Sequence, residues 1–385
     1  MKNIYDRSDF KSIIDEFSVK EISDEKLICL ISELVASGVT IKTAQPVYNF
    51  ASTGGPSSLT TILVPLYLYS YGVNVINIGV PGRPAGAIDV LSQINGYNVN
   101  LDVNSLSMKD HFYYHLAANN LYAPMDNELF MFRKEIGKIN IPNLAIASLI
   151  AKNMVTNAFA MGLDVRVSPF SNFGSTWDEC VENAKKFCRI SNKLNIKSYC
   201  FLSEANRPYQ RYIGRGEALI ALHNIFYSKD MSCAEEHNNY CKRIAIKILQ
   251  KTGARINQAN SLLESFSKNL LLQGSSLCEF DRTVQDLKKQ PRKELFANKN
   301  GYIHYNMYNI RKLIVEKQKK LYDNKPFPDN YGVTLLCNDG DYVVKGKPIA
   351  SIRSINSDFE TKDDSYYLIS DEIVNNERKE MLING

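Results

Sequence analysis

The sequence carries no charged residue between Lys42 and Arg83, and this stretch constrains the fold more than any other feature. A helix that spans a membrane needs about 20 mostly apolar residues in a row. Here several prolines and the Gly54–Gly55 pair interrupt the apolar run, so we expect no membrane span and no membrane partner. We expect these residues to form the deeply buried interior of a globular domain.

Apolar spacing and glycine-rich loops predict an α/β protein with a mostly parallel sheet. Helical spacing covers 8–37, where Ser23 is expected to cap the second helix. The loop ASTGGPSS leads into an apolar helix whose first turn is expected to contain Pro56, and 73–80 has the composition of a buried strand. A second loop, GVPGRPAG, opens another helix. Strand, glycine turn and helix in succession form the unit of a parallel sheet.

The same alternation continues along the chain. The pattern predicts a helix near 143–159, a strand at 163–168, a helix at 176–193, a strand at 196–202 and a helix at 216–227. From about 234 to 290 the chain is expected to be nearly all helical. From about 325 onward we expect a small β-rich appendage, because strand-like segments alternate there with Asn-Asp-Gly and Lys-Gly-Lys turns.

Charge and cysteine content narrow the class of partner and compartment. The net charge of +5 and the pI of about 8.6 are mildly basic, short of the clustered excess of a dedicated nucleic-acid binder, so no nucleic-acid partner is expected. The eight cysteines contain no C-x-x-C pair, and the N-terminal segment carries acids and lacks an apolar signal sequence. These features favour reduced thiols and a cytoplasmic location.

The first candidate binding element is Ser52-Thr53-Gly54-Gly55, followed closely by the hydroxyl of Thr61. Glycines allow backbone amides to turn toward a ligand, and the helix that follows presents its positive end. Together these groups make a cradle for phosphate or another anion. A simple helix-entry loop explains the motif equally well.

The second glycine loop contains Arg83, the only formal charge between Lys42 and Asp89. Two glycine loops at successive helix starts of one sheet converge on one crevice. A guanidinium in that crevice can bind a phosphate or carboxylate through two hydrogen bonds. The alternative is an arginine that bonds only to carbonyl groups of its own loop.

A third candidate is the pair Ser148 and Lys152, four residues apart on one face of a predicted helix. A lysine on this apolar helix either extends toward solvent or binds a ligand. His111 and His115 also share a helical face in KDHFYYHL, but no further ligand-spaced His or Cys accompanies them. We therefore expect surface histidines and no metal site.

Taken in order, these motifs resemble the thymidine/pyrimidine-nucleoside phosphorylase family and, more distantly, anthranilate phosphoribosyltransferase. The order runs from STGG and AGAIDVLSQINGY through Arg133, IASLIAKN, LDVRV and NRPYQRYIG to NGYIHY and GDYVVKGKPIASI. The resemblance implies a small all-helical domain facing a larger α/β domain across a cleft, with a C-terminal β-rich part.

Placed on this sequence, the resemblance implies three parts. They are a helical domain of 1–45 with approximately 143–180, an α/β domain of 46–142 with approximately 181–324, and a β-rich part of 325–385. The helical domain is shorter at its N-terminus than is usual in the family. Because that domain supplies the family's dimer contacts, a homodimer is an open expectation.

The resemblance also implies an activity. Enzymes of the family exchange an N-glycosidic bond to a pyrimidine base for a bond to phosphate. Their base-binding Arg, Ser and Lys correspond to Arg133, Ser148 and Lys152, with the same spacing. Cationic groups suit a base carbonyl and stabilise negative charge on a departing base, which gives Arg133 and Lys152 catalytic roles.

The phosphate side departs from the family pattern. Where the family has Lys-His before Ser-Thr-Gly-Gly, this sequence has Phe50-Ala51, and Arg83-Pro84 replaces a His-Thr pair. Ser52 and Thr61 still match phosphate-contacting hydroxyl positions. The residues expected to bind phosphate or another anion are Ser52, Thr53, Gly54, Gly55, Thr61 and Arg83.

The leading hypothesis is therefore a glycosyltransferase that cleaves or forms the N-glycosidic bond of a pyrimidine nucleoside or nucleotide, with an altered phosphate or acceptor site. It needs no cofactor beyond inorganic phosphate or a phosphorylated substrate. One alternative is a nucleoside- or nucleotide-binding protein without catalysis. Another is a phosphoribosyltransferase that uses a diphosphate donor and Mg²⁺, although Asp89 is the only acid near either loop and lies inside a predicted helix.

Overall fold

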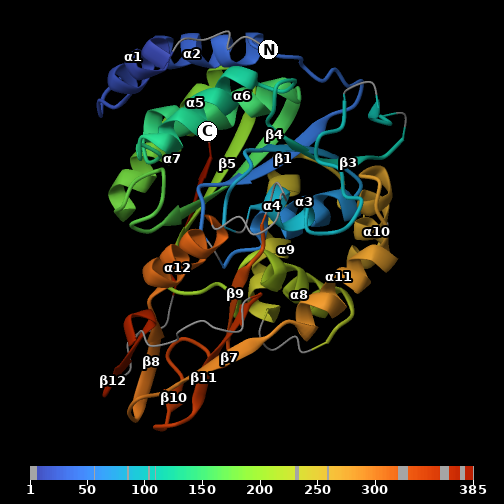
Figure 1. Cartoon of the computed structure of the whole chain (residues 1–385). Coiled ribbons are helices and arrows are strands. Elements are labelled where there is room, and N and C mark those ends of the chain that lie inside the picture. Colours follow the sequence, from blue (N-terminus) through green and yellow to red (C-terminus); the bar gives the residue numbers. More distant parts are fainter. Residues whose placement is uncertain are drawn as a thin grey trace.

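The computed structural model describes residues 7–55, 57–84, 86–102, 105–108, 110–229, 234–257, 260–319, 328–355, 364–372 and 378–384. A central sheet carries helices on both faces, and a β-rich part extends from one end of it (Figure 1). No helix within these ranges is both long and apolar enough to cross a bilayer.

The central sheet has the strand order β13-β5-β4-β1-β2-β3. Its strands are β1 (Val47–Ser52), β2 (Asn74–Gly79), β3 (Tyr113–Ala117), β4 (Ala158–Val167), β5 (Lys197–Glu204) and β13 (Glu380–Asn384). All neighbours pair in parallel except β13, which is antiparallel to β5. The predicted α/β class is confirmed, and the carboxyl ends of β1 and β2 meet at one edge of the sheet.

Strand β1, in the middle of the central sheet, is not predicted by the sequence pattern. It lies between β2 and β4, and its first four residues are all buried. A short strand covered on both faces has no polar side, so it shows no alternation with a period of two. The first glycine loop therefore follows a strand, as the second one does.

Helices cover both faces of the sheet. One face is covered by α3 (Thr60–Ser70), α8 (Arg215–Phe226), α9 (Glu235–Thr252), α10 (Leu262–Leu272) and α11 (Leu277–Lys289). The other is covered by α6 (Pro142–Val155) and α7 (Trp177–Lys193), against which pack α1 (Arg7–Phe17), α2 (Asp24–Ala36) and α5 (Pro124–Glu135). Ser23 caps α2 as predicted, because its side chain accepts a hydrogen bond from Lys26 N.

Two local expectations are wrong. Helix α3 begins at Thr60, so its first turn does not contain position 56, and Pro56 itself lies outside the described residues. His115 lies in strand β3 with 1% of its surface exposed, so it is neither helical nor at the surface. The spacing of four between His111 and His115 also places both on one side of an extended segment, because strand side chains alternate.

The C-terminal part contains two small antiparallel sheets, with strand orders β6-β9-β11-β7 and β10-β8-β12. Their elements are β6 (Tyr212–Ile213), β7 (Arg292–Phe296), β8 (Gly301–Tyr305), β9 (Tyr331–Leu335), β10 (Tyr342–Val343), β11 (Pro348–Ser354), β12 (Tyr367–Ser370), the helix α12 (Met307–Lys319) and the 3-10 turn η3 (Asp364–Tyr366). The β-rich part was expected to cover 325–385. The two sheets also contain β7 and β8, which precede residue 325 and pair with strands later in the chain. The last strand of the expected range, β13, joins the central sheet instead.

Two further elements complete the region around the glycine loops. The short helix α4 (Ala87–Leu91) follows the second loop, as the sequence pattern predicts. Helix α5 falls inside 46–142, the range drawn for the α/β domain, but it packs against α1 and α2 of the helical layer. Helix α5 therefore belongs to the helical layer.

The close packing of β1 against β4 leaves no space for a side chain at Gly162. A Cβ atom there would lie 2.5 Å from Phe50 Cδ2 and 2.6 Å from Ile248 Cδ1. We expect Gly162→Ala to lower the free energy of unfolding by about 1–3 kcal/mol through overpacking, as measured by urea denaturation. The loss should be smaller in a Phe50→Leu background, where the neighbouring side chain is shorter. An equal loss in both backgrounds would contradict this explanation.

Candidate functional site

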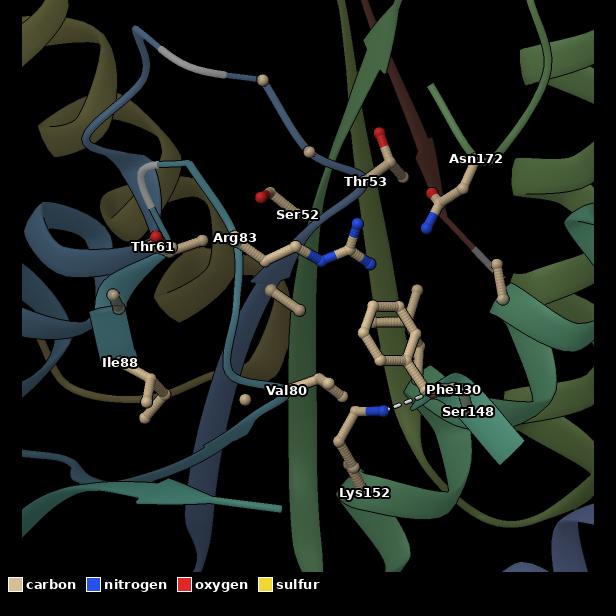
Figure 2. A pocket seen from close by; sticks show the side chains of 18 of the residues that line it. Ser52, Thr53, Thr61, Val80, Arg83, Ile88, Phe130, Ser148, Lys152 and Asn172 are labelled. Atoms are coloured by element: carbon tan, nitrogen blue, oxygen red, sulfur yellow. Dashed lines mark hydrogen bonds between the residues drawn. The ribbon is translucent and has the colours of Figure 1, made fainter. Parts of the chain in front are cut away.

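One cavity of about 150 Å³ lies between the two glycine loops and the helices α5 and α6. Every residue proposed for the site from sequence lines it: Ser52, Thr53, Gly54, Gly55, Thr61, Arg83, Arg133, Ser148 and Lys152. Figure 2 shows Ser52, Thr53 and Thr61 on the loop side and Ser148 and Lys152 on the helix side. The structure therefore brings both halves of the predicted site to one space at the carboxyl ends of β1 and β2, where open α/β sheets bind ligands.

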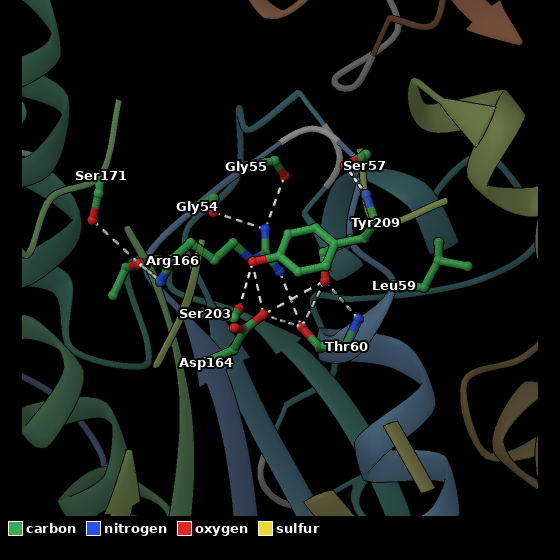
Figure 3. Close-up of polar contacts among 12 residues, drawn as sticks. Gly54, Gly55, Ser57, Leu59, Thr60, Asp164, Arg166, Ser171, Ser203 and Tyr209 are labelled. Carbon is green, nitrogen blue, oxygen red and sulfur yellow. Dashed lines mark hydrogen bonds and ion pairs between the residues drawn. The ribbon is translucent and has the colours of Figure 1, made fainter. Parts of the chain in front are cut away.

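The first glycine loop is held by a buried ion pair between Asp164 and Arg166, both on β4. Arg166 Nε donates to Asp164 Oδ2 over 2.8 Å, and its Nη1 donates to the carbonyls of Gly54 (2.8 Å) and Gly55 (3.0 Å). Arg166 Nη2 reaches the hydroxyl of Thr60 over 3.0 Å, and that hydroxyl donates to Asp164 Oδ2 over 2.6 Å. Figure 3 shows the guanidinium at the centre of these contacts. The loop conformation thus depends on two side chains that the sequence analysis did not assign.

The two glycines of this loop are required by their conformation. Both have positive φ, 111° at Gly54 and 129° at Gly55, and a Cβ atom on Gly55 would lie 2.8 Å from Arg166 Nη1. In a trans peptide the N–H points away from the C=O. Because the Gly54 carbonyl faces Arg166, the Gly55 N–H points away from this side chain.

The second glycine loop is held in the same manner by Asp89 and Arg215. The Asp89 carboxylate accepts hydrogen bonds from Gly82 N (2.8 Å) and Arg83 N (3.0 Å). Arg215 Nη2 donates to Asp89 Oδ1 over 2.9 Å and to the Arg83 carbonyl over 2.8 Å. These bonds engage the Arg83 backbone and leave its side chain to extend into the cavity, over the ring of Phe130 at 4.7 Å (Figure 2).

On the helix side, Lys152 and Ser148 share a buried acid, Asp126, at the start of α5. Lys152 Nζ lies 2.7 Å from Asp126 Oδ2, and Ser148 Oγ donates to the same oxygen over 3.0 Å. Lys152 also donates to Ser148. Burial lowers the pKa of Lys152, and the charge of Asp126 opposes that shift. The lysine therefore does not extend toward solvent, which was the alternative left open by its sequence context.

Arg133 reaches the same cavity from the last turn of α5. Its Nε donates to the carbonyl of Lys138 over 3.2 Å, and its Nη2 donates to the carbonyl of Ile139. Burial lowers the pKa of Arg133 to about 10, so the group stays charged at neutral pH. The bonds to the α5–α6 loop fix the guanidinium and leave other N–H groups for a ligand.

The described wall of the cavity is strongly cationic. Its charged side chains are Arg83, Arg133, Lys152, Arg166 and Arg311, and no described carboxylate lines it. Only Lys152 and Arg166 pair with acids, which lie behind the wall. The other three guanidinium groups form no ion pair with any acid in the described ranges. Such a wall favours an anionic ligand.

Three polar atoms at the cavity wall also have no hydrogen-bond partner among the described residues. They are Asn77 Nδ2, His115 Nδ1 and Asn172 Oδ1. Asn77 and His115 lie opposite each other on β2 and β3. Burial lowers the pKa of His115 to about 3, so its imidazole is neutral at pH 7. A buried polar group normally finds a partner, so these three atoms are unusual within the part of the chain that the structure describes.

Sequence reasoning missed several of these residues for different reasons. Asp126 and Arg133 lie seven residues apart, which is two turns of α5 and one face, so this spacing could have drawn attention to Asp126. Asp164 and Arg166 lie two apart in an apolar strand and share one side of it, which is a similar signal. Nothing in the sequence connects Arg311 with the site, because it reaches the cavity from α12.

Phe50 does not fill the cavity. It lines one wall, and its ring is 2% exposed within the core cluster formed with α3 and α9. Ala51 packs toward the helical layer on the other face, because neighbouring strand residues point to opposite sides. Both positions therefore contribute apolar surface to the cavity wall.

No protein-family model matches the chain. Over 387 residues it is 23% identical to the pyrimidine-nucleoside phosphorylase of Staphylococcus epidermidis strain RP62A, which covers 92% of this chain and 85% of that protein. The protein of the same name from Staphylococcus aureus strain USA300 is 22% identical over 377 residues, covering 92% and 87%. The resemblance inferred from the motifs is confirmed, and the chain is a divergent relative of proteins with this name.

Among solved structures, the chain is similar to anthranilate phosphoribosyltransferase from Thermus thermophilus. The sequence identity is 13% and the TM-score is 0.47, and the match covers 74% of this chain and 97% of that one.

The buried pair that holds the first glycine loop provides a stability test. We expect Arg166→Met to lower the free energy of unfolding by about 3–5 kcal/mol in urea denaturation, because Asp164 would be left as an unpaired buried charge. The double variant Arg166→Met/Asp164→Asn should recover part of this loss.

Arg189→Met is the matched control for this test. Arg189 pairs with Asp24 at the surface, over 2.9 Å, where an ion pair contributes about 0–1 kcal/mol. Equal losses for the buried and the surface arginine would contradict the role given to Arg166.

Proposed function

We propose that the protein is a pentosyltransferase of the pyrimidine-nucleoside phosphorylase type, which cleaves or forms the N-glycosidic bond of a pyrimidine nucleoside or nucleotide. The observation that carries this proposal is the cationic cavity between the glycine loops and α5–α6. Its wall suits a reaction in which the acceptor and the departing base both carry negative charge. The similarity to pyrimidine-nucleoside phosphorylases over 92% of the chain supports the reaction type.

Arg133, Ser148 and Lys152 are proposed to hold the base. An ammonium group has three protons, and Lys152 directs two of them to Asp126 and Ser148, which leaves the third for a carbonyl of the base. Arg133 has N–H groups beyond those bound to its own loop. Both cations can therefore contact oxygen atoms of a pyrimidine ring.

The proton arrangement around Ser148 favours a particular type of base. Lysine only donates and a carboxylate only accepts, so Ser148 donates its proton to Asp126 and accepts from Lys152. Its remaining lone pair suits the N3–H group of uracil or thymine. The N3 of cytosine carries no proton and would face an oxygen lone pair.

The opposite wall is proposed to hold the acceptor. The anion-binding groups are Ser52, Thr53, Thr61, Arg83 and the amides of Gly54 and Gly55, with inorganic phosphate or the phosphate of a phosphorylated substrate as the anion. In phosphorolysis a phosphate oxygen bonds to C1′ while the bond from C1′ to the base nitrogen breaks, and the electron pair leaves with the base. The negative charge on the departing base is stabilised by Lys152 and Arg133, which act as the catalytic residues.

Base release provides the direct test of this function. We expect uridine or thymidine to be cleaved in the presence of phosphate, and cytidine to be a poorer substrate. Lys152→Met should lower kcat/KM by about 10²- to 10³-fold, because one donor to the departing base is lost. Lys185→Met removes a charge from an exposed position on α7 and should leave kcat/KM unchanged. Cleavage that survives Lys152→Met undiminished would contradict the assignment.

A second candidate is a nucleoside- or nucleotide-binding protein without catalysis. The apolar Phe50 and Ala51, which stand where the family has Lys and His, favour it. Calorimetric binding of uridine without base release at any phosphate concentration would select this candidate. Base release without phosphate would indicate water or another acceptor.

A phosphoribosyltransferase that uses Mg²⁺ has less support in the geometry. Asp89 is the acid closest to the second loop, and its two oxygens already accept hydrogen bonds from two loop amides and Arg215. Activity with a diphosphate donor that depends on Mg²⁺ would support this third candidate.

The pH dependence of cleavage tests the role of Asp126. Burial lowers the pKa of Lys152 and Asp126 raises it, and a lysine without its proton cannot stabilise the departing base. The rate should therefore fall on the alkaline side, and Asp126→Asn should move that fall to lower pH because the charged lysine loses its partner. The measurement is the pH profile of kcat/KM, and identical alkaline limbs in the two proteins would contradict this role.

A further inference from the structure

Arg311 enters the cavity from a part of the chain that the sequence does not connect with the site. It lies on α12, in the C-terminal part, and lines the same cavity as the two glycine loops. Its guanidinium lies over the ring of Phe170, 5.5 Å from the centroid. Phe170 belongs to the segment after β4, so Arg311 extends from the C-terminal part to the edge of the central sheet.

Helix α12 is attached to the second glycine loop. Gln318, near the end of α12, is buried, and its Nε2 donates to the carbonyl of Pro84 over 3.4 Å. Pro84 directly follows Arg83, whose carbonyl is held by Arg215. The segment that carries Arg311 and the loop that carries Arg83 are therefore joined, both side chains line the cavity, and the charge of Arg311 acts on Arg83.

Neither guanidinium forms an ion pair with a described acid, although the charge of Asp89 raises the pKa of Arg83 from a greater distance. Arg83 and Arg311 are half-buried, each lies against an aromatic ring, and no acid in the described ranges pairs with either. Burial and the charge of Arg311 lower the pKa of Arg83 to about 10, which still leaves it charged at neutral pH. Two like charges in a partly buried wall repel each other, and a dianion between them would convert this repulsion into attraction.

We infer that Arg311 and Arg83 together bind the phosphate group used at this site, in an anion subsite divided between α12 and the second glycine loop. The inference rests on the proposed function for the statement that this phosphate takes part in a reaction. Two guanidinium groups present planar donor pairs that match phosphate oxygens. The shared ligand is a phosphate dianion, supplied either as inorganic phosphate or as the phosphate ester of a nucleotide substrate.

The subsite also explains how the chain can lack the family's phosphate-binding lysine. Position 50 is a phenylalanine packed in the core, so the first loop has lost its cation. Arg83 and Arg311 supply positive charge from the second loop and from α12 instead. The anion would therefore contact both the sheet edge and the C-terminal part.

The test measures binding of inorganic phosphate, uridine and uridine 5′-monophosphate to the full chain by calorimetry. Arg311→Met should lower the affinity for inorganic phosphate and for uridine 5′-monophosphate about tenfold to a hundredfold, because a charge-assisted pair of hydrogen bonds is lost. Uridine itself should bind within about twofold of wild type, since its contacts lie on α5 and α6. Arg311→Lys, which keeps the charge but not the planar donor pair, should show an intermediate loss.

The matched control is Lys312→Met, which removes a charge from the exposed neighbour of Arg311 on the same helix. It should leave all three affinities unchanged. Thermal unfolding of each variant in the absence of ligand shows that α12 is still folded, and Arg311→Lys keeps the test valid if Arg311→Met is unstable.

Two results distinguish the source of the phosphate. If uridine 5′-monophosphate binds more tightly than uridine, and Arg311→Met removes this difference, the phosphate belongs to the substrate. If uridine and its 5′-monophosphate bind equally and Arg311→Met lowers only the affinity for inorganic phosphate, the subsite holds the free acceptor. Both results support the inference. Equal affinity of wild type and Arg311→Met for both phosphate-bearing ligands, or no binding of either by wild type, overturns it.

These outcomes are separate from those for the proposed function. Binding of phosphate through Arg311 in a protein that cleaves no pyrimidine nucleoside contradicts the function and retains the subsite. If cleavage depends on phosphate but Arg311→Met leaves the affinity for phosphate unchanged, the subsite is contradicted and the proposed function is retained.

Discussion

The ion pair between Asp164 and Arg166 is the interaction on which the candidate site depends. Both side chains are almost completely buried, so each would be costly to hold without the other. The guanidinium offsets this cost by bonding the carboxylate, two loop carbonyls and a helix hydroxyl at once. A single side chain thus fixes the path from the end of β1 to the start of α3.

The second glycine loop repeats this solution with different residues. Asp89 accepts from two loop amides, and Arg215 bonds both the acid and a loop carbonyl. In each case a buried acid and a buried arginine hold the backbone from behind the cavity. Groups that face the ligand are then placed by the protein before the ligand arrives, which is the requirement for precise recognition.

The concentration of positive charge in the cavity wall lowers the stability of the unliganded protein. Guanidinium groups at positions 83, 133 and 311 have no acid partner in the described ranges, and three polar atoms at the wall lack hydrogen bonds. Mutual repulsion and lost solvation lower the stability of such a site. Functional sites often carry strain of this kind, because the same charges bind an anion strongly.

Most of the helices and three of the six central strands, β2, β4 and β5, could be predicted from the sequence, because apolar residues recur along each element with the period of its structure. The pattern failed at β1, which is short and covered on both faces, and at the segment of His111 and His115, where a spacing of four fits two structures. The candidates for base and anion binding came from the glycine loops and from the family resemblance, and the residues named for both roles line one cavity.

The acids and cations that contact these candidate residues, or face them across the cavity, could be found only from the tertiary structure. Asp126 meets Lys152 across two helices, Arg166 meets Gly54 across two strands, and Arg311 arrives from a helix in the C-terminal part. Local sequence encodes local conformation through backbone sterics and apolar periodicity. The pairing of charges from distant positions depends on how the elements pack, and no short-range pattern records it.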